Sequence, residues 1–347
     1  ECESALRTLG VAGFQLLGLN DYPGQGTAMT GVLDWLWEVK PFVRAEEYRR
    51  FCGPAVLLAE LPARTFTTGQ TIEAHIRIAH YGPEDLDSAE IHWKFCGSEG
   101  EILSEGRLEE QAVPTGCTTG LGAISIPLDR VKAPAACGLF LEVQGRRISN
   151  SWDVWVYPEA EKPLDSGDVL ITREWNEDTR QALREGRRVL LLHPAGAPGE
   201  KLPGMFMPVF WAWAFAGCNV PSTYGILCDP GHPALAAFPN TGHSDWQWWS
   251  LLHGADTFVL ESIAPGLEPV VRSIDTPHRS FPMSPLLEVR MGQGRLIAAT
   301  FNLEGAQTSD PVGRQMLASI LQYMNSEQFS PSQSFGFEQG DRLFGPP

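Results

Sequence analysis

The chain has 347 residues, of which 43% are hydrophobic and 10% aromatic, a composition typical of globular proteins. This length corresponds to two or three domains, each large enough to bury a core. Asp and Glu total 42 against 26 Lys and Arg, which gives a net charge of −16. So acidic a balance argues against a general nucleic-acid binder and against attraction to an anionic membrane surface. No apolar run reaches the ~18 residues of a membrane-spanning helix, so we expect no membrane span.

The beginning of the chain has the pattern of one part of a larger domain. Residues 3–9 resemble the end of a helix, and the near-continuous apolar run at 11–20 predicts a strand buried on both faces. Helices are predicted over 31–39 and 45–53. Helix, buried strand, loop and helix is the order found in a (β/α)8 barrel, which needs about 250 residues to close. We therefore expect residues 1–53 to be the C-terminal fragment of a barrel domain that starts upstream.

Period-two alternation then predicts an immunoglobulin-like β-sandwich over 54–160. The clearest strands are expected at 71–82, 89–97, 122–128, 137–143 and 151–157. In the last of these, apolar residues alternate with Asp153, Trp155 and Tyr157. We expect this aromatic and polar face to pack against a neighbouring domain, with sugar binding as the alternative.

After a polar linker, alternating strands and helices predict a three-layer α/β domain over 165–327, of Rossmann-like or flavodoxin-like type. A helix is expected over 176–186, with Asn176 as its N-cap, and a second helix over 311–325. Strands are expected at 168–173, 187–194, 222–229, 256–262, 286–294 and 295–303, the last two forming a hairpin. Residues 328–347 are polar, and we expect them to form a disordered tail.

The seven cysteines show no C-x-x-C pair and no His at ligand spacing, so we interpret them as buried thiols. In an oxidising compartment, Cys96 would be able to pair with Cys117 or Cys137. The histidines at 193, 232, 253 and 278 are isolated from one another. We therefore predict neither a metal site nor a cofactor.

Several segments resemble known proteins. GFQLLGLNDYPGQGTAMTGVLDWLWEVK (13–40) resembles the last strand, loop and helix of the catalytic barrel of glycoside hydrolase family 2, in its β-galactosidase-like branch from gut and environmental bacteria. EEYRRFCGPAVLL (46–58) is similar to the segment that leaves that barrel. HPALAAFPNTGHSDWQWWSLL (232–252), GQGRLIAATFNLE (292–304) and DPVGRQMLASILQYMNS (310–326) resemble the C-terminal α/β domain of the same multidomain proteins. That domain is itself similar to class I glutamine amidotransferases.

The resemblance implies a parent protein that hydrolyses β-linked glycosides by double displacement with retention. Such hydrolysis needs two carboxyl groups about 5–5.5 Å apart, and the family's acid/base and nucleophilic Glu precede the region matched here. No carboxylate in residues 1–53 fits either motif, so we expect no catalytic residue in this chain and little hydrolysis by it alone. The implied partners are a carbohydrate and the remainder of the barrel. Relatives are typically secreted or periplasmic.

Asn20, Asp21 and Tyr22 follow the expected barrel strand, and barrel enzymes place their sites at the C-terminal ends of strands. One interpretation has Asp21 or Asn20 hydrogen-bonding a sugar hydroxyl beside the Tyr22 ring. The other has Asp21 capping its own turn.

A second dense cluster spans 243–249, where His243, Asp245 and Trp246 are candidate substrate-binding residues. The structural alternative is a helix start with Ser244 as N-cap and the Trp residues packed inward.

Two further hypotheses concern other functions. The chain would be a non-catalytic carbohydrate-binding or interaction module if the sandwich and α/β domain act without a barrel. It would be an amidohydrolase if Cys218 or Cys228 were a nucleophile, but neither lies in a nucleophile elbow between glycines.

Overall fold

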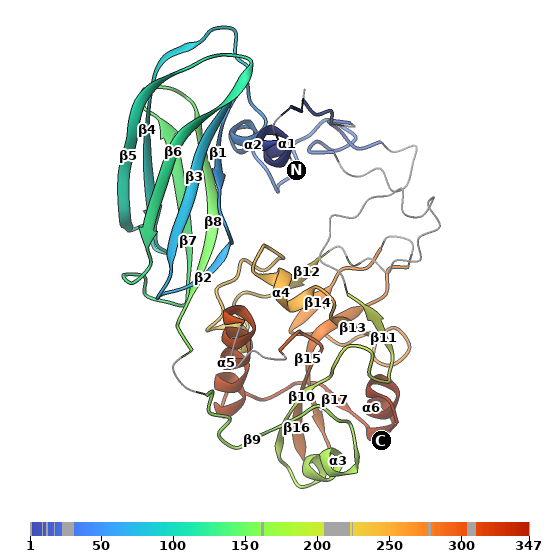
Figure 1. Ribbon diagram of the computed structural model, residues 1–347. Helices are drawn as coiled ribbons and strands as arrows, with labels where there is room; N and C mark the ends of the chain where they lie inside the picture. The colour runs from blue at the N-terminus through green and yellow to red at the C-terminus, as the bar shows by residue number, and fades with distance from the viewer. Residues whose placement is uncertain are drawn as a thin grey trace. The chain divides into compact units, whose positions relative to one another are not determined.

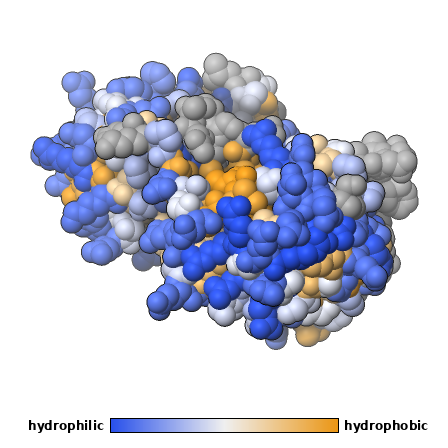
Figure 2. Space-filling model, turned by 90° about the horizontal axis from the view of Figure 1, so that it is seen from below, coloured by the Kyte–Doolittle hydropathy of each residue, from blue (hydrophilic) through white to orange (hydrophobic). Residues whose placement is uncertain are grey.

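The computed structural model describes residues 2–346 apart from 9, 12, 17, 23–30, 161–162, 205–222, 224, 277–278 and 304–309. The chain divides into two compact units, Glu1–Val156 and Tyr157–Pro347, shown in Figure 1. The described residues are rich in β-structure with few helices, and they close no barrel. No helix among them has the length and apolar character needed to cross a membrane. The face drawn in Figure 2 is mostly hydrophilic, with smaller hydrophobic areas between.

The first unit is built on a two-sheet β-sandwich. Its three-stranded sheet has the order β1 (Ala55–Glu60), β3 (Thr71–His80), β6 (Cys117–Pro127). Its five-stranded sheet has the order β2 (Thr65–Thr67), β8 (Ser149–Tyr157), β7 (Ala135–Val143), β4 (Leu86–Cys96), β5 (Ile102–Val113). All strand pairs in both sheets for which the register is described are antiparallel. The period-two segments of the sequence are confirmed as strands of this sandwich.

The core lies between the two sheets because alternate residues of each strand point inward. In β3 the inward residues are Ile72, Ala74, Ile76 and Ile78, all buried. On the mixed side of β8, Trp155 and Tyr157 are both buried, whereas Asp153 is exposed. The two rings are thus covered, and their packing against a neighbouring domain stays a prediction.

Two short helices precede the sandwich, α1 (Cys2–Arg7) and α2 (Ala45–Phe51). Helix α1 lies against the three-stranded sheet, where Leu6 packs on Val56, Leu58 and Ala79. The carboxylate of Glu3 accepts hydrogen bonds from Asn150 Nδ2 (2.8 Å) and from the indole of Trp152 (3.0 Å). Residues 2–53 thus belong to the same compact unit as the sandwich, and their origin in a separate barrel domain remains a prediction.

The described residues of 11–20 do not form the expected strand. Val11, Phe14, Leu16 and Leu19 are exposed, and the one strand contact described for this segment is an isolated parallel bridge between Asn20 and Leu33. A strand buried on both faces needs neighbouring strands on both sides, and the described residues supply none.

The expected helix at 31–39 is also wrong. The carboxylate Oδ1 of Asp34 accepts hydrogen bonds from the N–H groups of Leu36 (2.8 Å) and Glu38 (2.9 Å), and Trp37 has a positive φ of 68°. An aspartate that satisfies nearby amides in this way stabilises a turn in competition with a helix.

The second unit contains a mixed nine-stranded sheet with the main order β11 (Lys201–Pro203), β13 (Asp256–Val259), β15 (Met283–Met291), β16 (Gly294–Ala299), β10 (Arg188–Leu192), β9 (Val169–Thr172). The strands β12 (Ile226–Cys228), β14 (Val271–Ser273) and β17 (Ser334–Phe335) complete it. Among the described strands of this sheet, β9, β10 and β16 pair in parallel, and β17 pairs in parallel with β15. The predicted hairpin is confirmed as the antiparallel pair β15–β16.

Helices cover both faces of this sheet. On one face, α3 (Glu177–Arg184) and α6 (Phe337–Phe344) share a core with Val189 and Leu191 of β10. On the other face lies α5 (Pro311–Asn325), whose Tyr323 hydroxyl donates a hydrogen bond to Glu288 of β15 (2.8 Å). Figure 1 shows α5 and α6 on opposite sides of the sheet.

The predicted helix starts are explained by their caps. Asn176 accepts a hydrogen bond from the Thr179 N–H (3.0 Å) and is the N-cap of α3, as expected. Asp310 caps α5 by accepting from the N–H groups of Val312 and Gly313 (3.1 Å each).

The expectation of a disordered tail at 328–347 is wrong. Strand β17 and helix α6 lie in this segment, and Phe329, Phe335, Leu343 and Phe344 are buried. These apolar residues are widely spaced among Ser, Gln and Gly, so the segment has a polar composition although its few large side chains complete the core.

Candidate functional site

The first group of predicted site residues is Asn20, Asp21 and Tyr22, and the polar side chains of Asn20 and Asp21 are bonded to other groups of the same loop region. One carboxylate oxygen of Asp21 lies 2.6 Å from Lys40 Nζ, and the other accepts a hydrogen bond from the Gly31 N–H (2.9 Å). Asn20 donates from Nδ2 to the Asp21 carbonyl (3.0 Å), whereas Tyr22 is 61% exposed. The Asp21 carboxylate is therefore engaged within the chain, as the turn-capping interpretation expects, and a role in sugar binding remains a prediction.

The second predicted cluster is only partly available to a ligand. Asp245 accepts hydrogen bonds from the backbone N–H and the side-chain amide of Gln247 (3.1 Å each), while His243 Nδ1 lies 3.2 Å from the Thr241 carbonyl. Trp246 is 57% exposed. Binding of a ligand by His243, Asp245 or Trp246 remains a prediction.

The helix beside this cluster starts later than expected. Helix α4 spans Trp248–Leu252, so Ser244 is not its N-cap. Trp248 packs inward, with its ring centroid 5.2 Å from that of Phe238 and 6.0 Å from that of Phe301. The buried Gln247 accepts a hydrogen bond from the Tyr157 hydroxyl. Of the three tryptophans in this cluster, Trp248 alone is buried, whereas Trp246 and Trp249 are 57% and 40% exposed.

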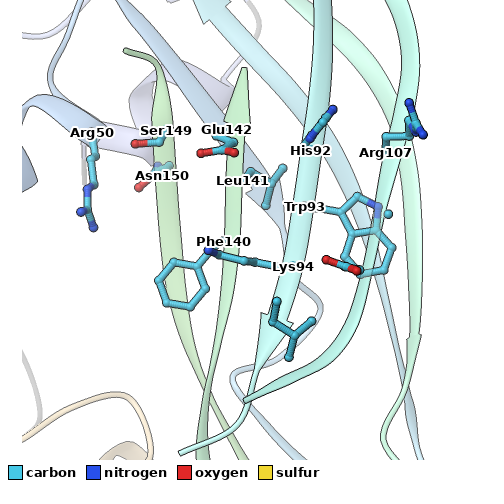
Figure 3. Close-up of a pocket in the computed structure, with 13 residues that line it drawn as sticks. Arg50, His92, Trp93, Lys94, Arg107, Phe140, Leu141, Glu142, Ser149 and Asn150 are labelled. Atoms are coloured by element: carbon cyan, nitrogen blue, oxygen red, sulfur yellow. The ribbon is translucent and has the colours of Figure 1, made fainter. Parts of the chain in front are cut away.

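A further cavity lies on the five-stranded sheet of the sandwich. This sheet-face groove has a volume of about 620 Å³. It is lined by side chains of α2, β4, β5, β7 and β8, which Figure 3 shows spread across the sheet from Arg50 on one side to Arg107 on the other. A smaller pocket of about 420 Å³, which we call the arginine pocket, shares Arg50 and Ser149 with the groove.

Strand register places the groove residues in two rows across the sheet. In one row His92 of β4 lies opposite Arg107 of β5 and Glu142 of β7. In the other, Lys94 lies opposite Glu105 and Phe140. Because residues two apart share a face of a strand, these side chains belong to the solvent side, opposite the core residues Ile91 and Phe95.

Charge within the groove is only partly paired. Glu90 lies 3.1 Å from His92 Nε2 and 3.2 Å from Arg107 NH1. Hydrogen bonds from His92 and Arg107 lower the pKa of the Glu90 carboxyl below its usual value. Arg50 donates to the Ser151 hydroxyl (3.3 Å).

Two aromatic side chains line the groove beside glycines. A Cβ on Gly138 would come within 2.7 Å of the Phe140 ring, and a Cβ on Gly106 within 2.8 Å of the Trp93 ring. Glycine therefore leaves the space that each ring occupies. The Phe140 ring is 38% exposed, with Lys94 Nζ 5.8 Å from its centroid.

Cys228 is disfavoured as a nucleophile. Burial raises the pKa of the Cys228 thiol to about 11, which disfavours the thiolate needed for nucleophilic attack; Cys218 lies outside the described residues. Cys96, Cys117 and Cys137 are free thiols. Within the described ranges no three His, Cys, Asp or Glu side chains are grouped to hold a metal ion.

The sequence analysis missed the sheet-face groove. The available signal was the alternation H-W-K in β4 and F-L-E in β7, which places His92 and Lys94 on the same face as Phe140 and Glu142 once the strands are paired. Nothing in the sequence indicated that β5 would extend this face, because its residues are polar on both sides.

Comparison with known proteins gives two family matches. A model described as "Domain of unknown function (DUF8487)" matches residues 170–345, and one described as "Domain of unknown function (DUF8488)" matches residues 70–158. No curated protein matches the chain.

Among solved structures, the CARDB domain of a Pyrococcus furiosus protein is 9% identical over 30% of this chain and 94% of its own, with a TM-score of 0.24. The β-glucuronidase of Parabacteroides merdae is 12% identical over 40% of this chain and 21% of its own, with a TM-score of 0.24. The β-glucosidase of Listeria innocua is 12% identical over 30% of this chain and 16% of its own, with a TM-score of 0.23. The similarity to glycosidases is thus weak, and it extends over about a fifth or less of those enzymes.

Proposed function

This chain belongs to the family described as domain of unknown function DUF8487, and from that premise we propose that it is the C-terminal portion of a retaining β-glycoside hydrolase resembling family 2. In this proposal residues 1–53 complete a catalytic barrel whose acid/base and nucleophilic glutamates lie upstream. The sandwich and the mixed-sheet unit, a degenerate relative of the amidotransferase-like domain, are accessory to that barrel.

The observation that carries the proposal is the apolar surface between residues 11 and 42. Among the described residues of this range, nine large apolar side chains are exposed by 40% or more: Val11, Phe14, Leu16, Leu19, Trp35, Leu36, Trp37, Val39 and Phe42. Burying one such side chain is worth about 1.5–3 kcal/mol, and exposed apolar patches of this kind mark interaction surfaces. A barrel that packs on this segment would bury them.

The resemblance of residues 13–40 to a closing barrel strand, loop and helix supports the same partner. In that setting the segment 11–20, which is near-continuously apolar, would gain the neighbouring strands that a doubly buried strand requires. Asn20, Asp21 and Tyr22 would then lie at the strand's C-terminal end, beside a bound glycoside. His243, Asp245 and Trp246 are proposed as a second carbohydrate contact.

Hydrolysis assays test this proposal. The chain alone and a full-length protein with its upstream sequence would be incubated with nitrophenyl β-glycosides, and the product anomer followed by NMR. We expect turnover with retention from the full-length protein and none from the chain alone. Enzyme-like turnover by the chain alone, or no turnover by the full-length protein, would overturn the proposal.

A second measurement tests the apolar surface itself. Leu16→Glu and Leu19→Glu should lower the thermal stability of the full-length barrel and leave the unfolding of the chain alone unchanged. Tyr81→Ser, at an exposed position on the sandwich, is the matched control and should change neither. Equal tolerance of all three variants in the full-length protein would contradict the docking of a barrel on this segment.

A further inference from the structure

The sheet-face groove is unusual for its charge. The chain carries a net charge of −16, yet the groove is lined by Arg50, Lys94 and Arg107 together with His92. The arginine pocket adds Arg49 and Arg147. The carboxylates lining the two are Glu46, Glu105 and Glu142. Cations therefore outnumber carboxylates along this face, the reverse of the chain as a whole.

Most of these cations are not neutralised by the chain. Among the described residues, no carboxylate lies within ion-pair distance of Arg49, Arg50, Lys94 or Arg147. Arg107 differs, because it is paired with Glu90. A cleft with unpaired cations concentrates anions from solution and favours a ligand that supplies the missing negative charge.

The groove also has the features of a sugar site. The partly exposed Phe140 ring offers apolar surface to the C–H side of a pyranose, and the Lys94 ammonium lies over this ring, 5.8 Å from its centroid. Ser149 and Glu142 lie opposite each other on β8 and β7. There the Glu142 carboxylate can accept hydrogen bonds from sugar hydroxyls, and the Ser149 hydroxyl can donate or accept them. Arg50 has planar geometry that suits bidentate binding of a carboxylate or sulfate.

From these observations we propose that the groove and the arginine pocket together bind an acidic oligosaccharide. One sugar ring lies on Phe140, and the acidic groups are held by Arg50, Lys94 and the arginines of the adjoining pocket. The choice of a saccharide among anionic ligands rests on the proposed function. A long polyanion such as a nucleic acid is disfavoured by the net charge of −16 on the whole chain.

Calorimetric titration of the chain tests the ligand class. The probes are tetragalacturonate, which carries carboxylates, a carboxylate-free sulfated carrageenan tetrasaccharide, neutral cellotetraose and an octaglutamate peptide. We expect at least one of the two acidic saccharides to bind at least tenfold more tightly than cellotetraose, with affinity that falls as NaCl is raised. The stronger of the two identifies the acidic group. The proposal would be overturned if neither acidic saccharide bound more tightly than cellotetraose, or if octaglutamate bound as tightly as the better acidic saccharide.

Substitutions then test the site. Lys94→Met and Phe140→Ala should each weaken binding of the acidic saccharide by about tenfold or more. Arg130→Gln and Tyr81→Ala, exposed residues outside both pockets, are the matched controls and should bind normally. Unchanged affinity in both groove variants would refute the site. Because binding is measured on the chain alone, this result is independent of whether the full-length protein hydrolyses glycosides.

Discussion

The indole N–H of Trp175 donates a hydrogen bond to Asp341 (2.9 Å), which joins the start of α3 to helix α6 across 166 positions of the sequence. The same Asp341 carboxylate lies 3.2 Å from Arg180 of α3. Next to this contact, the Phe344 ring lies 5.1 Å from Trp175 and 5.4 Å from Phe258, measured between centroids. The last helix is thus an integral part of the core of the second unit.

Phe344→Ala is therefore expected to destabilise the second unit by about 3–5 kcal/mol, because it removes a buried aromatic ring and leaves a cavity. Urea unfolding followed by tryptophan fluorescence measures the loss. Phe337→Ala, which truncates a half-buried ring on the same helix, serves as the control and should cost less. Equal, near-zero effects of both variants would show that α6 does not hold the core together.

The ion pair between Asp21 and Lys40 should contribute about 1–2 kcal/mol of coupling free energy, because both groups are largely buried and the carboxylate also binds the Gly31 amide. A double-mutant cycle with Asp21→Asn and Lys40→Met, monitored by thermal unfolding, gives this coupling. A coupling near zero would mean that the pair is not formed in solution.

In the full-length protein, unchanged kcat/KM for Asp21→Ala would show that Asp21 supports the loop without contacting substrate.

His193 should make the second unit less stable in mild acid. Its side chain is buried, with Nε2 3.0 Å from the Phe344 carbonyl oxygen, and burial lowers the pKa of its imidazole below 6.5. Lys201 lowers this pKa further and Asp256 raises it. Below pH 6.5 the unfolded chain binds a proton that the folded chain does not, so the free energy of unfolding falls as the pH drops towards the lowered pKa.

This contribution should disappear in His193→Gln. Between pH 7 and 5, the wild-type chain should lose stability with a slope that is larger than that of the variant by up to about 1.4 kcal/mol per pH unit. His243→Gln, at an exposed histidine, is the control and should keep the wild-type slope. Parallel curves for wild type and His193→Gln would contradict the prediction.

Much of the fold was accessible from the sequence where one local rule decides the structure. Helix α5 occupies the predicted range because a capping aspartate, a proline at the first turn and a regular apolar face agree. The alternating strands β3, β7 and β8 were likewise evident.

The failures occurred where distant contacts or side-chain turns decide the structure. Strand β5 has mostly polar residues on both faces, so only its pairing with β4 reveals it. The turn at Asp34 replaces the helix that the apolar spacing predicted. Helix α6 depends on partners such as Trp175, far away in sequence. The groove required the register of four strands, which no single segment contains.

Strand β5 has a consequence for self-association. It ends the five-stranded sheet, and its free side presents the twelve residues Ile102–Val113. An edge of that length is a template onto which a second chain would add a strand. Register shifts at three places in the β4–β5 pair distort the ladder, and Glu105, Arg107, Glu109 and Glu110 are exposed along it. Irregular hydrogen-bond spacing and the like charge of Glu105, Glu109 and Glu110 together disfavour stacking of copies at this edge, so we expect the sheet to resist amyloid-like extension.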